Sequence, residues 1–236
     1  MRPIGFSTGA LAYADFGRGL AMTRTAACAV VELSALRQAE LLPLLESLES
    51  LDLAGFDYIS IHAPSHFEPT WEALAWDRLR EECWRNWPIV VHPDTLFDFS
   101  LWRQFGNLLC VENMDKRKAI GRTARELGRI FEQLPDASFC FDIGHARQCD
   151  PTMTEAYLIL REFGSKLRQV HVSEVNTRSK HDPLSYASIL AYQEVAQLIP
   201  PNVPLILETP VAADRIEAEM AKVRIALPLP RQIMVA

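Results

Sequence analysis

The chain has 236 residues, of which 49% are hydrophobic and 23% are charged, and its formal net charge is −6 at pH 7. This composition suits one compact domain over residues 1–236 with a sizeable core, and it excludes a disordered chain. The negative charge disfavours nucleic-acid binding driven by bulk electrostatics. No segment reaches membrane-spanning length and no signal-peptide pattern opens the chain, so we expect a cytoplasmic protein without a membrane partner.

Short β-branched or aromatic runs alternate with longer helical stretches along the whole chain. Eight strands are predicted at residues 3–8, 29–33, 57–62, 88–92, 107–112, 138–142, 167–172 and 204–208. Helices are predicted at residues 39–51, 70–84, 122–134, 153–163 and 186–199, where apolar side chains recur three or four positions apart. Eight strand–helix units favour a single (β/α)₈ barrel over an open dinucleotide-binding sheet, since no GxGxxG follows the first strand.

Seven of the apolar runs end on a residue that can bind a metal or move a proton. In chain order these residues are Glu32, His62, His92, Glu112, Asp142, His171 and Glu208. In a barrel, the ends of parallel strands meet at one face, so these side chains are expected to converge there. We interpret Glu32, and the nearby His66, as hydrogen-bonded structural residues, because a single His or Glu at a strand end usually has that role.

Several carboxylates at one face would repel each other unless a cation neutralised them. The set Glu112, Asp142, His171 and Glu208 offers three carboxylates and one imidazole, which suits Mn²⁺, Mg²⁺, Co²⁺ or Zn²⁺. Glu174, three residues after His171, is a candidate hydrogen-bond partner that orients a ligand. The sequence therefore predicts one divalent metal ion at the mouth of the barrel.

Three motifs carry a resemblance to a known family: VENMD around Glu112, FDIGHA around Asp142 and His145, and HVSEVNTR around His171. With them the chain, from IGFSTGAL to LILETP, resembles the xylose isomerase-like TIM barrels. This superfamily includes sugar and sugar-phosphate isomerases and epimerases, inosose dehydratases and DNA repair enzymes of the endonuclease IV type. The resemblance implies that Glu112, Asp142, His171 and Glu208 bind the metal.

For the isomerase and epimerase branch, the resemblance implies proton transfer next to the carbonyl of a small sugar or sugar phosphate, through an enediolate. Glu112 and Glu208 would remove and return the proton as well as bind the metal. Arg178 is expected to hold a substrate oxygen, although it stands one residue later than in ketose 3-epimerases. The complete expected substrate-binding set is His62, His92, His145, Arg178 and His181.

The endonuclease IV branch offers an alternative function. Its members use histidines ending strands three and four, a D-x-x-H histidine and a later D-x-H pair to hold up to three zinc ions that attack a phosphodiester. The chain has the histidines, but Ser179 stands two residues before His181, where the Asp of that pair would be. A third possibility is a barrel that has kept its ligands without turnover. The oligomeric state is left open.

Overall fold

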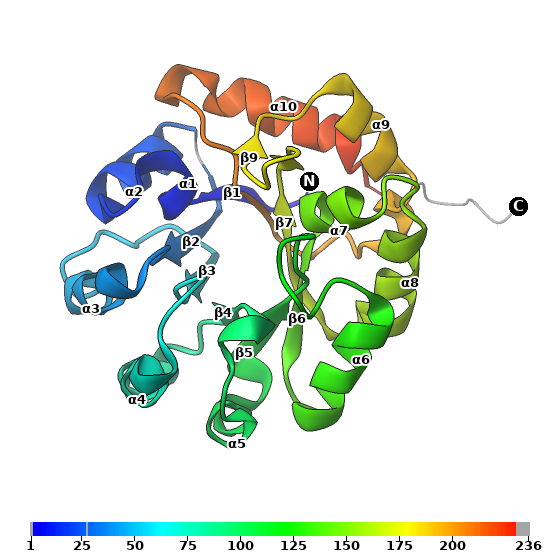
Figure 1. Cartoon of the computed structure of the whole chain (residues 1–236). Coiled ribbons are helices and arrows are strands. Elements are labelled where there is room, and N and C mark those ends of the chain that lie inside the picture. Colours follow the sequence, from blue (N-terminus) through cyan, green and yellow to red (C-terminus); the bar gives the residue numbers. More distant parts are fainter. Residues whose placement is uncertain (1, 27, 230–236) are drawn as a thin grey trace, which may run out of the picture.

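The computed structural model describes residues 2–26 and 28–229, apart from the side chain of Thr25. In this part of the chain, eight parallel strands form a closed barrel in the order β1-β10-β7-β6-β5-β4-β3-β2. Figure 1 shows the barrel with the helices arranged around it. The strands are β1 (Ile4–Ser7), β2 (Val30–Ser34), β3 (Tyr58–His62), β4 (Ile89–Val91), β5 (Leu109–Glu112), β6 (Ser138–Asp142), β7 (Leu167–Val172) and β10 (Leu205–Leu207). The predicted (β/α)₈ barrel is confirmed.

Helices connect the strands and cover the outside of the barrel. The α-helices are α1 (Thr8–Ala12), α2 (Phe16–Thr25), α3 (Gln38–Ser47), α4 (Glu72–Glu81), α5 (Phe99–Trp102), α6 (Ala124–Gln133), α7 (Ile143–Cys149), α8 (Thr154–Phe163), α9 (Tyr186–Gln193) and α10 (Ile216–Ala226). Short 3₁₀ turns lie at Pro69–Trp71, Cys83–Arg85, Pro93–Thr95, Arg103–Leu108, Gly164–Lys166, Ala196–Leu198 and Ala213–Arg215. Among the described residues, no helix has both the length and the apolar character needed to cross a membrane.

Every predicted strand coincides with an observed barrel strand to within two residues at either end. The five predicted helices correspond to α3, α4, α6, α8 and α9. Helices α1, α2, α5, α7 and α10 were not anticipated from the sequence. Two glycines in the first turns of α2, Gly17 and Gly19, lower its helix propensity, and α7 is only seven residues long and follows β6 without a loop.

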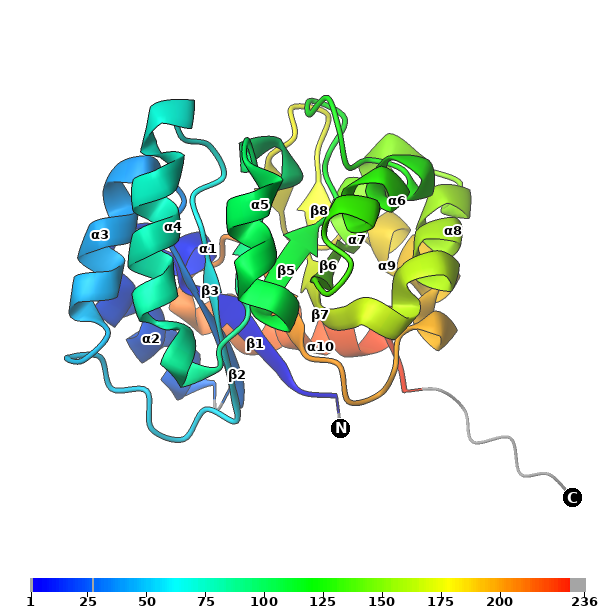
Figure 2. The same ribbon diagram turned by 90° about the horizontal axis from the view of Figure 1, so that it is seen from below.

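A small antiparallel hairpin stands apart from the barrel sheet. Its strands are β8 (Glu174–Val175) and β9 (His181–Asp182), and they follow the C-terminal end of β7. Figure 2 shows the barrel from the side, with β8 at one end and the start of the described chain at the other. The hairpin therefore places His181 at the face where the strands end.

Two kinds of buried side chain occupy the two faces of the strands. Alternate residues point into the barrel, and Val90, Cys110 and Cys140 form a small buried cluster that is separate from the main core. The large core lies between the strands and the helices, where residues such as Trp102 and Phe139 are fully buried. Residues two positions after the inner cluster, at the strand ends, therefore point into the mouth of the barrel.

Gly5 lets β1 and β2 approach each other closely. A Cβ at Gly5 would lie 1.8 Å from the backbone oxygen of Val30, so a side chain there must displace a strand backbone. We expect Gly5→Ala to lower the free energy of unfolding by about 3 kcal/mol, because the closed barrel cannot shift one strand alone. Urea denaturation of the purified variant measures this change.

Gly17 in α2 provides the matched control. A Cβ there meets no atom within 4 Å, and an exposed helical glycine costs roughly 0.5–1 kcal/mol relative to alanine. Gly17→Ala should therefore hold or raise the free energy of unfolding. Equal stability of the Gly5→Ala and Gly17→Ala proteins would show that the close strand contact does not constrain the barrel.

Candidate metal centre

The four residues predicted to bind a metal meet at the C-terminal end of the barrel. Glu112 and Asp142 are the last residues of β5 and β6, His171 lies one residue before the end of β7, and Glu208 directly follows β10. Each offers one ligand atom, and these atoms all lie within 4.8 Å of one another. The parallel register, which sets Asp142 beside His171 on the neighbouring strand, accounts for this proximity. We call these four residues the quartet.

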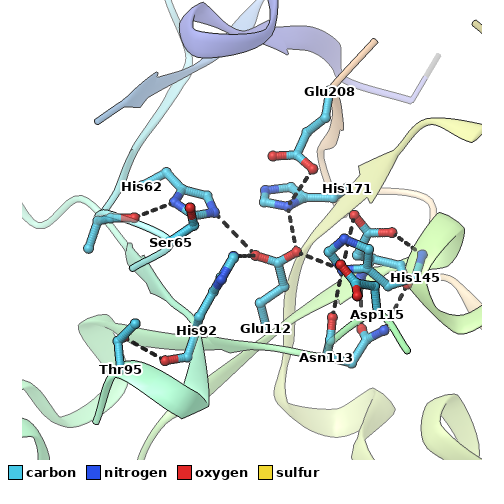
Figure 3. A network of polar contacts seen from close by, with 12 residues as sticks. His62, Ser65, His92, Thr95, Glu112, Asn113, Asp115, His145, His171 and Glu208 are labelled. Atoms are coloured by element: carbon cyan, nitrogen blue, oxygen red, sulfur yellow. Dashed lines mark hydrogen bonds and ion pairs between the residues drawn. The ribbon is translucent and has the colours of Figure 1, made fainter. Parts of the chain in front are cut away.

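Glu112 lies at the centre of the site (Figure 3). Its Oε2 atom lies 3.2 Å from His62 Nε2 and 3.3 Å from His92 Nε2. Its Oε1 atom lies 3.2 Å from His145 Nδ1 and 3.4 Å from His171 Nδ1. Burial raises the pKa of Glu112, but the attraction of His171 and His92 outweighs burial and holds this pKa well below its ordinary value. One carboxylate thus connects two pairs of imidazoles.

A second set of potential metal ligands shares Glu112 with the quartet. His62, His92 and Glu112 also bring one ligand atom each within 4.8 Å of the others. His62 Nδ1 lies 2.6 Å from the carbonyl oxygen of Ala63, which can only accept, so Nδ1 carries the hydrogen. In a neutral His62 ring, the Nε2 lone pair then faces Glu112. His62, His92 and Glu112 would be able to hold a second divalent ion, since imidazole nitrogens and a carboxylate are ligands that such ions accept.

The buried carboxylates of the site require nearby positive charge. Burial, opposed by the attraction of His145, raises the pKa of Asp142 to about 6, and burial also raises the pKa of Glu208. Burial lowers the pKa of His62 and of His145, but the surrounding carboxylates outweigh it and raise these values to about 9 and about 10. Protons on imidazoles thus supply the positive charge that a divalent cation would otherwise provide.

Unpartnered atoms in the quartet indicate that it fits a divalent metal. Glu112 Oε1, Asp142 Oδ2 and His171 Nδ1 are buried and have no hydrogen-bond partner among the described residues. A buried polar atom without a hydrogen-bond partner costs about 1–3 kcal/mol, so three such atoms in one cluster require a physical explanation. Carboxylate oxygens and an imidazole nitrogen are ligands that Mn²⁺, Mg²⁺, Co²⁺ or Zn²⁺ accept. The donor set therefore fits the predicted ion.

Local structure around β6 fixes Asp142. Its Oδ1 atom accepts a hydrogen bond from the backbone nitrogen of His145 at 2.6 Å and so caps α7, which leaves Oδ2 for a ligand. The Asn113 side chain accepts from Asp142 N and donates to Asp142 O, both at 2.8 Å. A Cβ at Gly144 would lie 2.6 Å from Ser173 O and 3.2 Å from Asp142 Oδ1. The FDIGHA motif thus requires glycine where the turn approaches β7.

The histidines after β6 and β7 lie side by side at the mouth. The rings of His145 and His181 are 5.5 Å apart, and His181 Nδ1 lies 2.7 Å from Ser173 Oγ. His181 Nδ1 also lies 3.6 Å from Glu208 Oε2. Burial lowers the pKa of His181 to about 4, so this ring is neutral at physiological pH. The expected placement of both histidines at the site is therefore observed.

Arg178 does not lie where the sequence predicted. Its side chain is exposed and does not line the cavity over the metal centre. The cause is the hairpin turn, in which Asn176 Oδ1 accepts hydrogen bonds from Arg178 N and Lys180 N at 2.8 and 3.1 Å. Ser179 completes the turn with a positive φ of 53°. The turn holds residue 178 at the surface, so a substrate contact from Arg178 is not supported.

Glu174 does not orient a metal ligand either. Its carboxylate accepts a hydrogen bond from Ser185 N at 2.8 Å and faces Arg147 at 3.4 Å. Glu32, and not Glu174, contacts His171, since its Oε2 atom lies 3.0 Å from His171 Nε2. The signal that could have identified Glu32 was present, since VVE ends an apolar run as the other site residues do. His66, interpreted from the sequence as a hydrogen-bonded structural residue, is 80% exposed at the rim of the cavity and faces Glu68 at 4.0 Å.

A cavity of about 510 Å³ opens over the centre, a size that admits a small molecule. Lys118 Nζ donates to Asp94 Oδ2 at 2.7 Å and to Ser65 O at 3.0 Å, which ties the loop after β5 to the loops after β3 and β4. The cavity is lined by Leu36, His62, Ser65, His66, His92, Glu112, Met114, Asp115, Arg117, Lys118, His145, Ser179, His181 and Glu208. Every predicted histidine of the substrate-binding set thus borders this space.

Solved structures of other proteins resemble the fold. No protein-family model and no curated protein sequence matches the chain. The apo crystal structure of 3-keto-D-glucoside 4-epimerase, YcjR, from E. coli superposes with a TM-score of 0.58 at 10% identity, over 96% of this chain and 99% of that one. The crystal structure of SacUVDE gives 0.52 at 12% identity, over 87% and 81%. At such identities these likenesses show the fold alone, which is a (β/α)₈ barrel.

Proposed function

We propose that the protein is a divalent-metal-dependent isomerase or epimerase that moves a proton next to the carbonyl of a small sugar or sugar phosphate. The observation that carries this proposal is the quartet, whose ligand atoms lie within 4.8 Å of one another beneath a cavity of about 510 Å³. An enzyme with this barrel fold, YcjR, is a 3-keto-D-glucoside 4-epimerase, which is consistent with sugar chemistry in such a site.

Glu112, Asp142, His171 and Glu208 would hold the ion. A bound divalent ion polarises a carbonyl and makes the adjacent C–H more acidic. Glu208 is suited to accept that proton, because its side chain is 11% exposed at the cavity and burial raises its pKa. Glu112 is 1% exposed, has a pKa well below its ordinary value and lies among four imidazoles. We therefore assign Glu112 mainly to binding of the ion and, in addition, to the return of the proton.

His62, His92, His145 and His181 would hold the substrate. All four line the cavity. Both nitrogens of His62 already contact Ala63 O and Glu112, whereas His145 uses Nδ1 toward Asn113 O, and its raised pKa makes Nε2 a hydrogen-bond donor for a substrate oxygen. The neutral His181 ring, bonded to Ser173 Oγ through Nδ1, presents its other nitrogen to a ligand. These contacts would orient a polyhydroxylated molecule against Glu208.

Phosphodiester hydrolysis is a second candidate function, and one observation favours it. His62, His92 and Glu112 form a ligand group adjacent to the quartet, and two neighbouring ions clamp both oxygens of a phosphoryl displacement. Against this function stand the net charge of −6 and Ser179, which replaces the aspartate of the D-x-H pair. Zinc would be the ion expected in that case.

Metal content tests the shared basis of both functions. We expect purified protein to contain about one divalent ion per chain, and Asp142→Asn to lower the bound metal strongly, because it weakens a ligand of the quartet. Inductively coupled plasma mass spectrometry on both proteins gives the number of metal ions per chain. Two or three zinc ions per chain would favour phosphodiester chemistry, and a metal-free wild-type protein that takes up no added ion would contradict both functions.

Deuterium wash-in from D₂O into a panel of ketoses and sugar phosphates tests proton transfer directly. We expect Glu208→Gln and Glu112→Gln each to reduce exchange by about 10²–10⁴-fold, the usual contribution of an acid–base group. Glu208→Gln should keep more bound metal than Glu112→Gln, since Glu112 lies deeper among the ligands. Glu194→Gln, at an exposed residue directly after α9, is the control and should exchange at the wild-type rate.

Nicking of an abasic-site duplex tests the second function on the same preparations. We expect no nicking by the wild-type protein. Cleavage that is lost in His92→Ala, together with no deuterium uptake by any sugar, would replace the isomerase proposal with hydrolysis.

In the deuterium experiment, exchange that persists in Glu208→Gln at the wild-type rate would contradict the assignment of Glu208 as the base.

A further inference from the structure

Glu32 lies inside the barrel, beneath the metal centre, and the proposed chemistry gives it no role. The side chain is fully buried on β2. Its Oε2 atom has three close partners, which are Gln169 Nε2 at 2.6 Å, His171 Nε2 at 3.0 Å and Ser60 Oγ at 3.1 Å. Ser60 and Gln169 both donate to this oxygen, so the interior of the barrel supplies hydrogen-bond donors to a buried carboxylate.

The partners of Glu32 determine which nitrogen of His171 carries a hydrogen. A carboxylate oxygen can only accept, so the contact of His171 Nε2 with Glu32 Oε2 requires a hydrogen on Nε2. The Gln169 amide nitrogen lies 2.8 Å from the same Nε2 atom and carries two hydrogens, one of which it donates to Glu32. If it donated the other to Nε2, the lone pair of Nε2 would face the Glu32 carboxylate at 3.0 Å, which is repulsive. The Gln169 carbonyl oxygen accepts from Tyr58 at 2.7 Å. Tyr58 therefore fixes the orientation of the Gln169 amide.

With its hydrogen on Nε2, a neutral His171 ring has its lone pair on Nδ1. That atom has no hydrogen-bond partner among the described residues, and it lies 3.4 Å from Glu112 Oε1 and 3.6 Å from Glu208 Oε2. These are the oxygens of two other quartet members. The lone pair therefore points at the position where the ion would be held, and the opposite tautomer would point a hydrogen there.

We propose that Glu32 is a positioning residue that fixes the tautomer and orientation of His171, so that Nδ1 is the metal ligand. This inference rests on the proposed metal centre. It places Glu32 behind His171, in preference to a second candidate ligand group of Glu32, His62, His171 and Glu208, whose atoms also lie within 4.8 Å of one another. A carboxylate behind a metal-bound imidazole also raises the basicity of the ligand, and removal of such a partner typically lowers metal affinity roughly 10–100-fold.

Metal affinity of the apo protein tests the proposal without any activity assay. Co²⁺ and Zn²⁺ are titrated into wild-type and Glu32→Gln proteins in competition with a chelating dye. We expect the variant to bind roughly 10–100-fold more weakly, and its Co²⁺ absorption bands to shift because the imidazole is held differently. Affinity within threefold of wild type, with unchanged bands, would overturn the proposal.

Two control variants separate positioning from general stability. Glu72 is also a buried glutamate, which accepts hydrogen bonds from Trp102 Nε1 and from two backbone nitrogens at the outside of the barrel. Glu72→Gln should lower the unfolding temperature and leave metal affinity unchanged. Ser60→Ala removes one donor to Glu32 without touching His171, and it should change affinity by less than threefold. A loss in Ser60→Ala equal to that in Glu32→Gln would contradict a specific role for the Glu32–His171 contact.

The tautomer can be read from the wild-type protein if Glu32→Gln does not fold. Histidines are labelled with ¹⁵N, and long-range ¹H–¹⁵N spectra are recorded on the Zn²⁺-loaded protein, with His171→Gln used to assign the ring. We expect a hydrogen on Nε2 and a metal-shifted Nδ1. A hydrogen on Nδ1, or zinc on Nε2, would overturn the proposal.

Failure of this inference can be distinguished from failure of the proposed function. If wild-type protein binds no metal, the metal centre itself is wrong, and the role of Glu32 toward it is wrong with it. If wild-type protein binds metal through His171 Nε2, only the role of Glu32 is wrong. If metal binds as proposed but no sugar exchanges deuterium, the positioning role holds and the reaction must be replaced.

Discussion

The mouth of this barrel depends on one electrostatic constraint, which is the burial of several carboxylates around a single point. Glu112 is almost fully buried and lies within 3.4 Å of four imidazole nitrogens, while Asp142 and Glu208 offer oxygens to the same cluster. Such a group of acids is stable in a low-dielectric interior only when positive charge lies among them. Protons on the histidines satisfy this need without a metal, and a divalent ion satisfies it more directly, since it also takes up the unpartnered Glu112 Oε1 and Asp142 Oδ2.

The scaffold meets this constraint through strand register. Each ligand lies at or next to the end of a different strand, and parallel pairing brings Glu112 beside Cys140 and Asp142 beside His171. Close backbone contacts hold the strands at that register, as the lack of room for a Cβ at Gly5 shows. The geometry of the site is therefore a property of the closed barrel and not of its connecting loops.

The sequence allowed the fold and the quartet to be predicted because both follow from local patterns. An apolar run ending on a polar residue marks a strand end, and Glu112, Asp142 and His171 each ended such a run. Arg178 was misplaced because its position depends on a turn in which Asn176 accepts two backbone hydrogen bonds, and loop conformation is not encoded in strand periodicity. Glu32 was interpreted as a hydrogen-bonded structural residue, and its contacts with Ser60 and Gln169 agree with this, but its contact with His171 could not be predicted because the two residues lie on strands far apart in the sequence.

The interior of the barrel is polar beneath His171, where a hydrogen-bond partner orients a proposed metal ligand. Cys110 and Cys140, two positions before Glu112 and Asp142, belong to a small apolar cluster, whereas Gln169, two positions before His171, is polar and bonded to Glu32. This difference follows from the chemistry of the ligands. Either oxygen of a carboxylate can bind an ion, so Glu112 and Asp142 require no choice between donor atoms. An imidazole binds through only the nitrogen that lacks a hydrogen, so His171 requires a buried acceptor to fix its tautomer. The buried Glu32 carboxylate thus lies beneath His171, the one ligand of the quartet with two neutral tautomers.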